Sequence, residues 1–138
     1  MTRLLEMGIE PFLAASSVAS AIAQRLVRTI CPRCKTPYDP PKDILEKMGI
    51  EPDKGQQFFH GKGCKTCRNS GYKGRTGIFE ILVVNNEIRE LILRKASDAE
   101  IKQAAIKAGM KTLREDGIKK ALEGTTTIDE VMRVTQLD

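Results

Sequence analysis

The four cysteines of this chain occur as two Cys-x2-Cys pairs, CPRC at 31–34 and CKTC at 64–67, with 29 residues between the pairs. Four thiols at this spacing can form disulfides, a dithiol redox couple or a metal site. The two sulfurs of a Cys-x2-Cys knuckle converge on one point, and two knuckles complete a tetrahedral site with metal–sulfur distances of about 2.3 Å. The pattern therefore predicts one metal site formed by Cys31, Cys34, Cys64 and Cys67.

The two other uses of the thiols fit the sequence less well. The N-terminus lacks the basic head and apolar middle of a signal peptide, and we expect a reducing compartment in which disulfides are rare. A thioredoxin-type redox site needs one Cys-x2-Cys at a helix start, whereas loops are expected around both pairs here. We therefore expect a structural Zn²⁺. Iron uses the same four-sulfur geometry and stays an alternative.

The metal is expected to hold the fold of residues 31–74, which contain few large apolar side chains. Such a segment buries too little surface to offset about 1–2 kcal/mol of backbone entropy per residue. A structural zinc contributes about 10–16 kcal/mol in comparable small modules. We expect the loss of one cysteine to unfold this segment and to leave the helices after residue 85 largely intact.

No active site is evident in the sequence. GKGCKT at 61–66 resembles a P-loop superficially, but Cys64 separates its glycine from its lysine. Four cysteine ligands leave no open metal position for a catalytic water. The single histidine, His60, is expected to be a surface or packing residue. We assign no catalytic residue and no cofactor-binding residue.

Hydrophobic periodicity and turn signals predict a mixed α/β chain. Helices are expected before the cysteines and within the segment between the pairs, at 2–7, 10–23 and 42–48. Strands are expected at RLVRTI (25–30), at 56–60 and at RTGIFEILVV (75–84), and the last of these is expected to be buried on both faces. After residue 85 four short helices are expected to form a compact bundle. Their start signals are Asn85-Asn86 and three capping boxes that begin at Ser97, Thr112 and Thr127.

The positive charge lies in the cysteine segment. The net charge of the chain is +5, and residues 31–74 carry nine basic and five acidic groups. Four thiolates around a divalent metal have a net charge of about −2, which these lysines and arginines partly neutralise. A surface for nucleic acid or acidic lipid is the alternative explanation.

Four stretches carry a resemblance to a known family: MGIEPFLAASS, AQRLVRTICPRCK, SGYKGRTGIFEIL and GMKTLREDGIKKALEGTTTIDEVMRVT. In order and spacing they resemble the C-terminal part of the ATPases of type II secretion and type IV pilus assembly. The resemblance covers nearly the whole chain, and the four cysteines match the metal ligands of that family.

The resemblance implies an α+β fold, in which the edge of a RecA-like ATPase domain carries an inserted zinc-binding subdomain and a C-terminal bundle of short helices. The strands at 25–30 and 75–84 are then neighbours. The implied domains are a remnant of the ATPase domain (1–30), a tetracysteine zinc-binding subdomain (31–74), a returning strand of the ATPase sheet (75–84) and a small helical domain (85–138). The nucleotide-binding motifs of the family would lie before residue 1, so we expect a C-terminal fragment.

The expected function is that of the zinc-binding C-terminal portion of a hexameric cytoplasmic ATPase that powers type II protein secretion. Zn²⁺ is the expected cofactor of this chain, and ATP and Mg²⁺ belong only to the full-length protein. The implied partners are the other subunits of a homohexamer and secretion-platform proteins, through which the ATPase lies at the cytoplasmic face of the inner membrane.

Three alternatives stay open. RLVRTIC resembles the type II secretion members slightly more than the pilus members, and the same region of a pilus assembly ATPase is the first alternative. A free-standing zinc ribbon that binds nucleic acid is the second. We expect no nucleic acid partner, because the cysteine segment lacks an evident aromatic stacking platform. A scaffold or adaptor without a motor is the third.

Overall fold

A computed structural model describes residues 2–51 and 56–135 of the chain. The chain divides into two compact units, of which unit 1 comprises the residues up to 23 together with 80–112. Unit 2 comprises residues 24–79 and those from 113 onward. None of the helices in the described ranges is long and apolar enough to cross a membrane.

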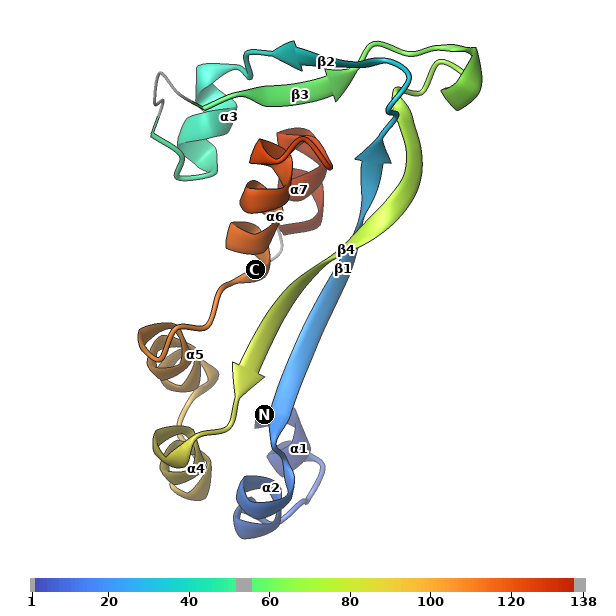
Figure 1. The fold of residues 1–138 in the computed structure, drawn as a ribbon. Coiled ribbons are helices and arrows are strands. Elements are labelled where there is room, and N and C mark those ends of the chain that lie inside the picture. Colours follow the sequence, from blue (N-terminus) through green and yellow to red (C-terminus); the bar gives the residue numbers. More distant parts are fainter. Residues whose placement is uncertain (1, 52–55, 136–138) are drawn as a thin grey trace. The chain divides into compact units, whose positions relative to one another are not determined.

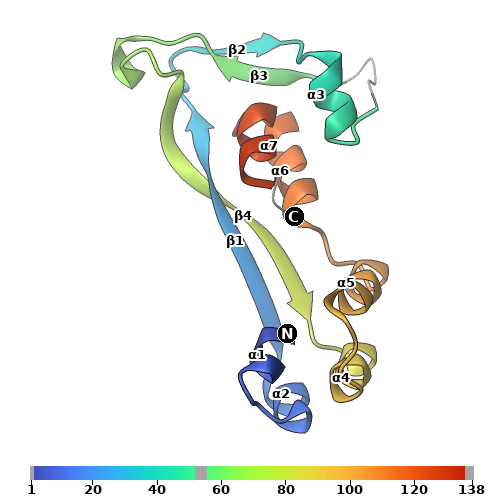
Figure 2. The same ribbon diagram turned by 180° about the vertical axis from the view of Figure 1, so that it is seen from behind.

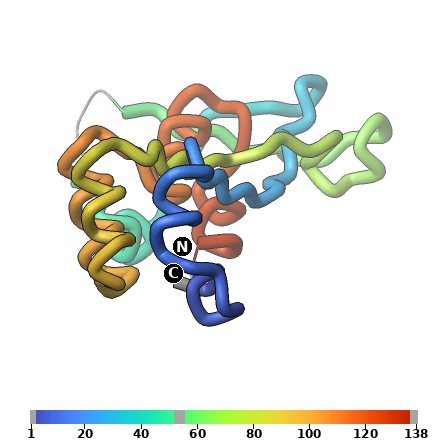
Figure 3. The backbone as a smooth tube through the Cα atoms, turned by 90° about the horizontal axis from the view of Figure 1, so that it is seen from below, coloured from blue at the N-terminus to red at the C-terminus, as the bar shows by residue number. Residues whose placement is uncertain are grey.

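Unit 1 consists of four helices around one apolar core, together with the adjoining ends of two strands. Its helices are α1 (Thr2–Glu6), α2 (Pro11–Ser17), α4 (Asn86–Leu93) and α5 (Asp98–Lys107). The start signals of α4 and α5 are confirmed, since Asn85 accepts a 2.9 Å hydrogen bond from the Ile88 N–H and Ser97 forms a capping box with Glu100. Figures 1 and 3 show α4 and α5 side by side. The core side chains of this unit include Ala14, Ala15, Val84, Ile88, Leu91, Ile92, Ile101 and Ala105.

Unit 2 contains the segment between the cysteine pairs and the last two helices. Its short elements are β2 (Lys35–Tyr38), α3 (Lys42–Lys47), β3 (Phe58–Gly61), the 3-10 helix η1 (Lys65–Cys67), α6 (Leu113–Leu122) and α7 (Ile128–Thr135). β2 and β3 pair antiparallel, with Lys35 opposite Gly61. Figure 2 shows this pair and α3 next to α6 and α7.

Two longer strands, β1 (Ser20–Ile30) and β4 (Tyr72–Val83), form a second two-stranded sheet. This pairing confirms the prediction that the segments 25–30 and 75–84 are neighbours. In unit 2 the inward side chains of the sheet, Val27 and Ile78, pack against Leu113 at the start of α6.

Two predictions about these strands are wrong. The helix expected over 10–23 ends at Ser17, because Val18 is extended and β1 already begins at Ser20. Pairing with β4 outweighs the helical preference of the alanines in this stretch, because tertiary context overrides intrinsic propensity. β4 is also not buried on both faces: Ile78 is fully buried, whereas Phe79, Ile81 and Val83 are exposed. The strand follows the alternation of a sheet with one covered face.

The four C-terminal helices are divided between two separate cores, which differs from the single bundle expected. α4 and α5 pack with α2 in unit 1. Ala121, Ile128 and Val131 of α6 and α7 share a core with side chains of the cysteine segment, among them Leu45 and Phe58. Hydrophobic patterning shows which face of a helix is buried but not which partner covers it. The boundaries of the four implied domains stay predictions.

Candidate metal centre

The four cysteines lie in two tight loops of unit 2. Cys31 follows the last residue of β1, and Cys34 directly precedes β2. Cys64 stands at the start of η1, and Cys67 is its last residue. The four Sγ atoms all lie within 4.8 Å of one another. The structure therefore brings together the four cysteines that the sequence singles out.

The sulfur–sulfur distances distinguish between the possible uses of these thiols. Sγ of Cys31 lies 3.9 Å from that of Cys64, and Sγ of Cys34 lies 3.9 Å from that of Cys67. The Sγ atoms of Cys64 and Cys67 are 3.7 Å apart. A disulfide requires about 2.05 Å. A tetrahedron with metal–sulfur distances of about 2.3 Å has edges of about 3.8 Å. These three distances thus match the edges of such a tetrahedron, and the remaining sulfur–sulfur distances are within 4.8 Å.

The two loops have the same local geometry. In each pair the N–H of the second cysteine turns back on the first. The Cys34 N–H donates to the Cys31 carbonyl at 3.2 Å, and the Cys67 N–H donates to the Cys64 carbonyl at 3.2 Å. In the second pair the Cys64 N–H also donates to Cys67 Sγ at 3.2 Å. Such turns aim both sulfurs of a pair at one point.

Backbone contacts hold the two loops together. The Cys31 N–H donates to the Gly71 carbonyl at 2.9 Å, and the Lys62 N–H donates to the Cys34 carbonyl at 3.0 Å. Gly71 has a φ of 76°, and a Cβ there would collide with the backbone of Gly61. Glycine is therefore required at 71 both for its conformation and for the close approach of the chain.

The electrostatic surroundings of the thiols differ. Burial raises the pKa of Cys34 to about 12. The Cys67 backbone N–H lowers the pKa of Cys64. Burial acts to raise the pKa of Cys67, but hydrogen bonds, chiefly from the backbone N–H groups of Cys64 and Gly71, lower it to about 6. N–H donors that favour a thiolate are suited to a metal site, because the thiolate is the form that binds a metal.

His60, the single histidine, is not a member of the cluster. Its ring stacks on that of Tyr38, with the ring centroids 4.8 Å apart. This contact agrees with the expectation of a surface or packing residue.

Sequence reasoning missed the role of Glu130, a buried residue of unit 2 that forms ion pairs with Arg28 and Arg133. The predicted capping box of α7 is half formed, since the Glu130 N–H donates to the Thr127 hydroxyl at 3.2 Å. The Glu130 carboxylate, however, accepts hydrogen bonds from Arg28 and Arg133. The Thr-x-x-Glu pattern indicates a helix start, and no sequence signal connects Glu130 to an arginine 102 residues away.

One protein family matches nearly the whole chain. The family described as Type II/IV secretion system protein matches residues 1–133. The chain belongs to this family. The resemblance noted in the sequence is thereby confirmed.

Curated relatives include both branches of that resemblance. The chain is 43% identical to the type II secretion system protein E of Pseudomonas aeruginosa over 136 residues, which are 99% of the chain and 27% of the relative. It is 45% identical to the type IV pilus assembly ATPase PilB of Thermus thermophilus over 137 residues, 98% of the chain and 15% of the relative. It is 42% identical to the type II secretion system ATPase E of Vibrio cholerae, over 99% of the chain and 27% of the relative. The chain thus spans about a quarter or less of the length of these relatives.

Proposed function

We propose that Cys31, Cys34, Cys64 and Cys67 hold one structural Zn²⁺. The observation that carries this proposal is the set of sulfur–sulfur distances of 3.7–3.9 Å, which match the edges of a tetrahedral zinc–thiolate site. Bound zinc would supply folding free energy rather than catalysis, because all four positions are filled by sulfur and none is open for water or substrate. The role of these residues is to fix the shape of unit 2.

We further propose that the chain is the zinc-binding C-terminal portion of a hexameric ATPase that powers type II protein secretion. Its family and the names of its relatives support this proposal. The proposed partners are the other subunits of the hexamer and proteins of the secretion platform at the cytoplasmic face of the inner membrane. ATP and Mg²⁺ would bind to parts of the protein outside this chain.

Exposed apolar side chains on β1 and β4 support the proposal that these strands belong to the edge of a larger, RecA-like sheet. In unit 2 Phe79 is such a residue, and in unit 1 they are Ile22, Ile81 and Val83. Such side chains in neighbouring strands are typical of a face that other elements cover.

A pilus assembly ATPase is the second candidate, because the identity to the Thermus thermophilus relative is as high as that to the secretion relatives. Complementation separates the two candidates. The full-length gene should restore protein secretion, and not pilus assembly, in strains that lack the corresponding ATPase. Restoration of pili alone would assign the chain to pilus assembly.

The motor assignment has its own test in the gene. The codons upstream of Met1 should encode a G-x4-G-K-[ST] phosphate-binding loop. In the full-length protein, Cys64→Ser should abolish secretion, whereas Lys65→Ser, an exposed neighbour in the same loop, should not. An upstream sequence without that loop would contradict the assignment and favour the adaptor or the free-standing zinc ribbon.

A further inference from the structure

A pocket in unit 2 is lined by three arginines and one leucine. Leu26 and Arg28 lie on β1, Arg75 lies on β4 and Arg133 lies on α7. Three elements distant in sequence thus contribute arginines to the lining of one pocket. None of the four residues is a cysteine of the metal centre.

Glu130 holds two of these arginines in place. Its side chain is only 2% exposed, and its two carboxylate oxygens accept hydrogen bonds from Arg28 Nη2 at 2.6 Å and from Arg133 Nη2 at 2.9 Å. Arg133 Nε donates to the same carboxylate at 3.0 Å, and the Arg28 backbone N–H donates to it at 2.9 Å. The buried carboxylate therefore fixes both guanidinium groups at one side of the pocket.

The aromatic ring of Tyr72 fixes Arg28 from another direction. The guanidinium carbon of Arg28 lies 4.1 Å from the ring centroid, which is a cation–π contact. The Tyr72 hydroxyl lies 2.9 Å from the Thr127 hydroxyl and shares a hydrogen bond with it, which fixes the ring in turn. Arg28 is thus preorganised by a charge and by a ring, which reduces the entropy lost when a ligand binds.

The arginines retain capacity for a further ligand. A guanidinium group carries five N–H donors, and the bonds to Glu130 use only some of those on Arg28 and Arg133. The side chains of these two residues are 49% and 57% exposed. Arg75 is exposed and forms no ion pair within the described part of the chain. Among the described residues that line the pocket or pair with its lining, three arginines accompany one carboxylate, which leaves an excess of two positive charges.

We propose that this pocket binds a phosphoryl group. Several arginines in the lining of one pocket suit the oxygens of a phosphate, which accept paired N–H donors, and its double negative charge matches the excess of two. A phosphoryl group can come from inorganic phosphate or from a nucleotide. Leu26 provides an apolar wall beside the charged groups.

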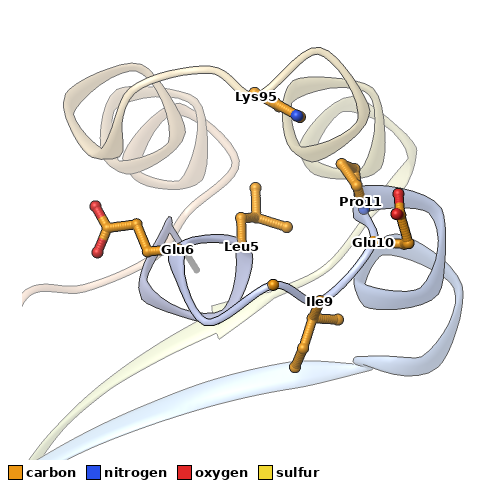
Figure 4. Close-up of a pocket in the computed structure, with 7 residues that line it drawn as sticks. Leu5, Glu6, Ile9, Glu10, Pro11 and Lys95 are labelled. Carbon is orange, nitrogen blue, oxygen red and sulfur yellow. The ribbon is translucent and has the colours of Figure 1, made fainter.

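A pocket in unit 1 lacks such a set of like charges. Its lining includes Leu5 and Ile9 together with Glu6, Glu10 and Lys95 (Figure 4). Charges of both signs lie at its edge, and no preorganised cluster of one sign is present among its lining residues. It indicates no class of ligand.

The test is a calorimetric titration of the zinc-loaded chain with inorganic phosphate and with ATP, at constant ionic strength. Arg75→Gln should weaken binding about tenfold or more, because charge-assisted hydrogen bonds are lost. The matched control is Arg25→Gln, which removes the same charge from β1. Residues 25 and 26 point to opposite faces of a strand, so Arg25 faces away from the pocket, and its loss should change affinity less than about twofold. Arg75→Lys keeps the charge and should still weaken binding, because the paired donors are lost.

The two probes identify the source of the phosphoryl group. ATP that binds more tightly than phosphate, with the same dependence on Arg75, indicates a nucleotide, and equal affinity indicates free phosphate. Absence of binding by both probes would overturn the proposal, as would equal losses in the Arg75 and Arg25 variants. Acetate that binds the pocket as strongly as phosphate would overturn the proposal too, since the pocket would then be a carboxylate site. The proposal would also be overturned if the chain bound no phosphate but self-associated in a way that depends on Arg75. The ligand would then be an acidic protein surface.

Discussion

The hydroxyl group of Tyr38 donates a 3.1 Å hydrogen bond to the carboxylate of Asp129, 91 residues further along the chain. Tyr38 ends β2 in the cysteine segment, and Asp129 lies in the first turn of α7. Burial, together with the neighbouring carboxylate, raises the pKa of Tyr38, so its hydroxyl keeps the proton that it donates. The bond joins the same two parts of unit 2 that share the core of Phe58, Ile128 and Val131.

This hydrogen bond should contribute measurably to stability. We expect Tyr38→Phe and Asp129→Ala each to lower the free energy of unfolding, with a coupling energy of about 0.5–1 kcal/mol in a double-mutant cycle. Urea denaturation of the four proteins measures the coupling. Strictly additive effects would show that the two side chains do not stabilise one another.

The core that the cysteine segment shares with α6 and α7 changes which helices should unfold when the metal is lost. We now expect Cys64→Ser to expose the amide groups of the cysteine segment and those of α6 and α7 to hydrogen exchange. α4 and α5 should keep their protection, because they belong to the separate core of unit 1.

Hydrogen–deuterium exchange with mass spectrometry resolves these segments. The control is Lys65→Ser, which changes an exposed residue of the same loop and should leave the exchange pattern unchanged. Retained protection of α6 and α7 in the Cys64→Ser protein would mean that they fold without the metal centre, as the sequence alone led us to expect.

Gly117 of α6 lies close to Val131 of α7. A Cβ at this position would collide with the side chain of Val131. Glycine to alanine within a helix normally stabilises a protein by about 0.5–1 kcal/mol. Here we expect Gly117→Ala to destabilise unit 2 by about 1–3 kcal/mol, because the added methyl group overpacks the interface.

A second variant separates overpacking from other causes. Val131→Ala removes the methyl groups that the new Cβ would meet, so the double variant should be less destabilised than the sum of the two single variants. Thermal unfolding measures all three. Gly117→Ala with raised stability would show that the two helices are not in close contact.

Glu130 should make the stability of unit 2 depend on pH in acid. Burial acts to raise its pKa, but the hydrogen bonds from Arg133 and Arg28 lower it from 4.5 to about 2. The folded state therefore binds this proton less tightly than the unfolded state. The stabilisation is fully present above about pH 4.5 and is lost as the pH falls through about 2.

We accordingly expect the difference in stability between the wild type and Glu130→Gln to be largest at neutral pH and to shrink below pH 4.5. Denaturant titrations of both proteins at several pH values measure this difference, from which contributions common to the two, such as metal release, cancel. A difference that stays constant down to pH 2 would contradict the ion pairs described here.

The clustering of the four cysteines was predictable from the sequence because its signal is local. Two Cys-x2-Cys pairs specify two turns, and four sulfurs specify one tetrahedral site. The start signals at Asn85 and Ser97 were equally local and are confirmed. The partners of α6 and α7 were not predictable, since an amphipathic pattern does not specify what covers it.

The arginine pocket was invisible in the sequence for the same reason. Arg28, Arg75 and Arg133 lie on three elements, and only the pairing of β1 with β4 and the packing of α7 bring them together. Glu130 was assigned to a helix cap, although its carboxylate binds those arginines instead. Long-range ion pairs have no spacing rule that would reveal them.

X-ray absorption at the zinc edge, combined with the metal content of the purified chain, tests the central claim most directly. We expect about one zinc per chain with four sulfur neighbours at about 2.3 Å. A folded chain with less than about half a zinc, or a zinc with nitrogen or oxygen neighbours in place of any of the four sulfurs, would contradict the assignment of Cys31, Cys34, Cys64 and Cys67 as one structural zinc site.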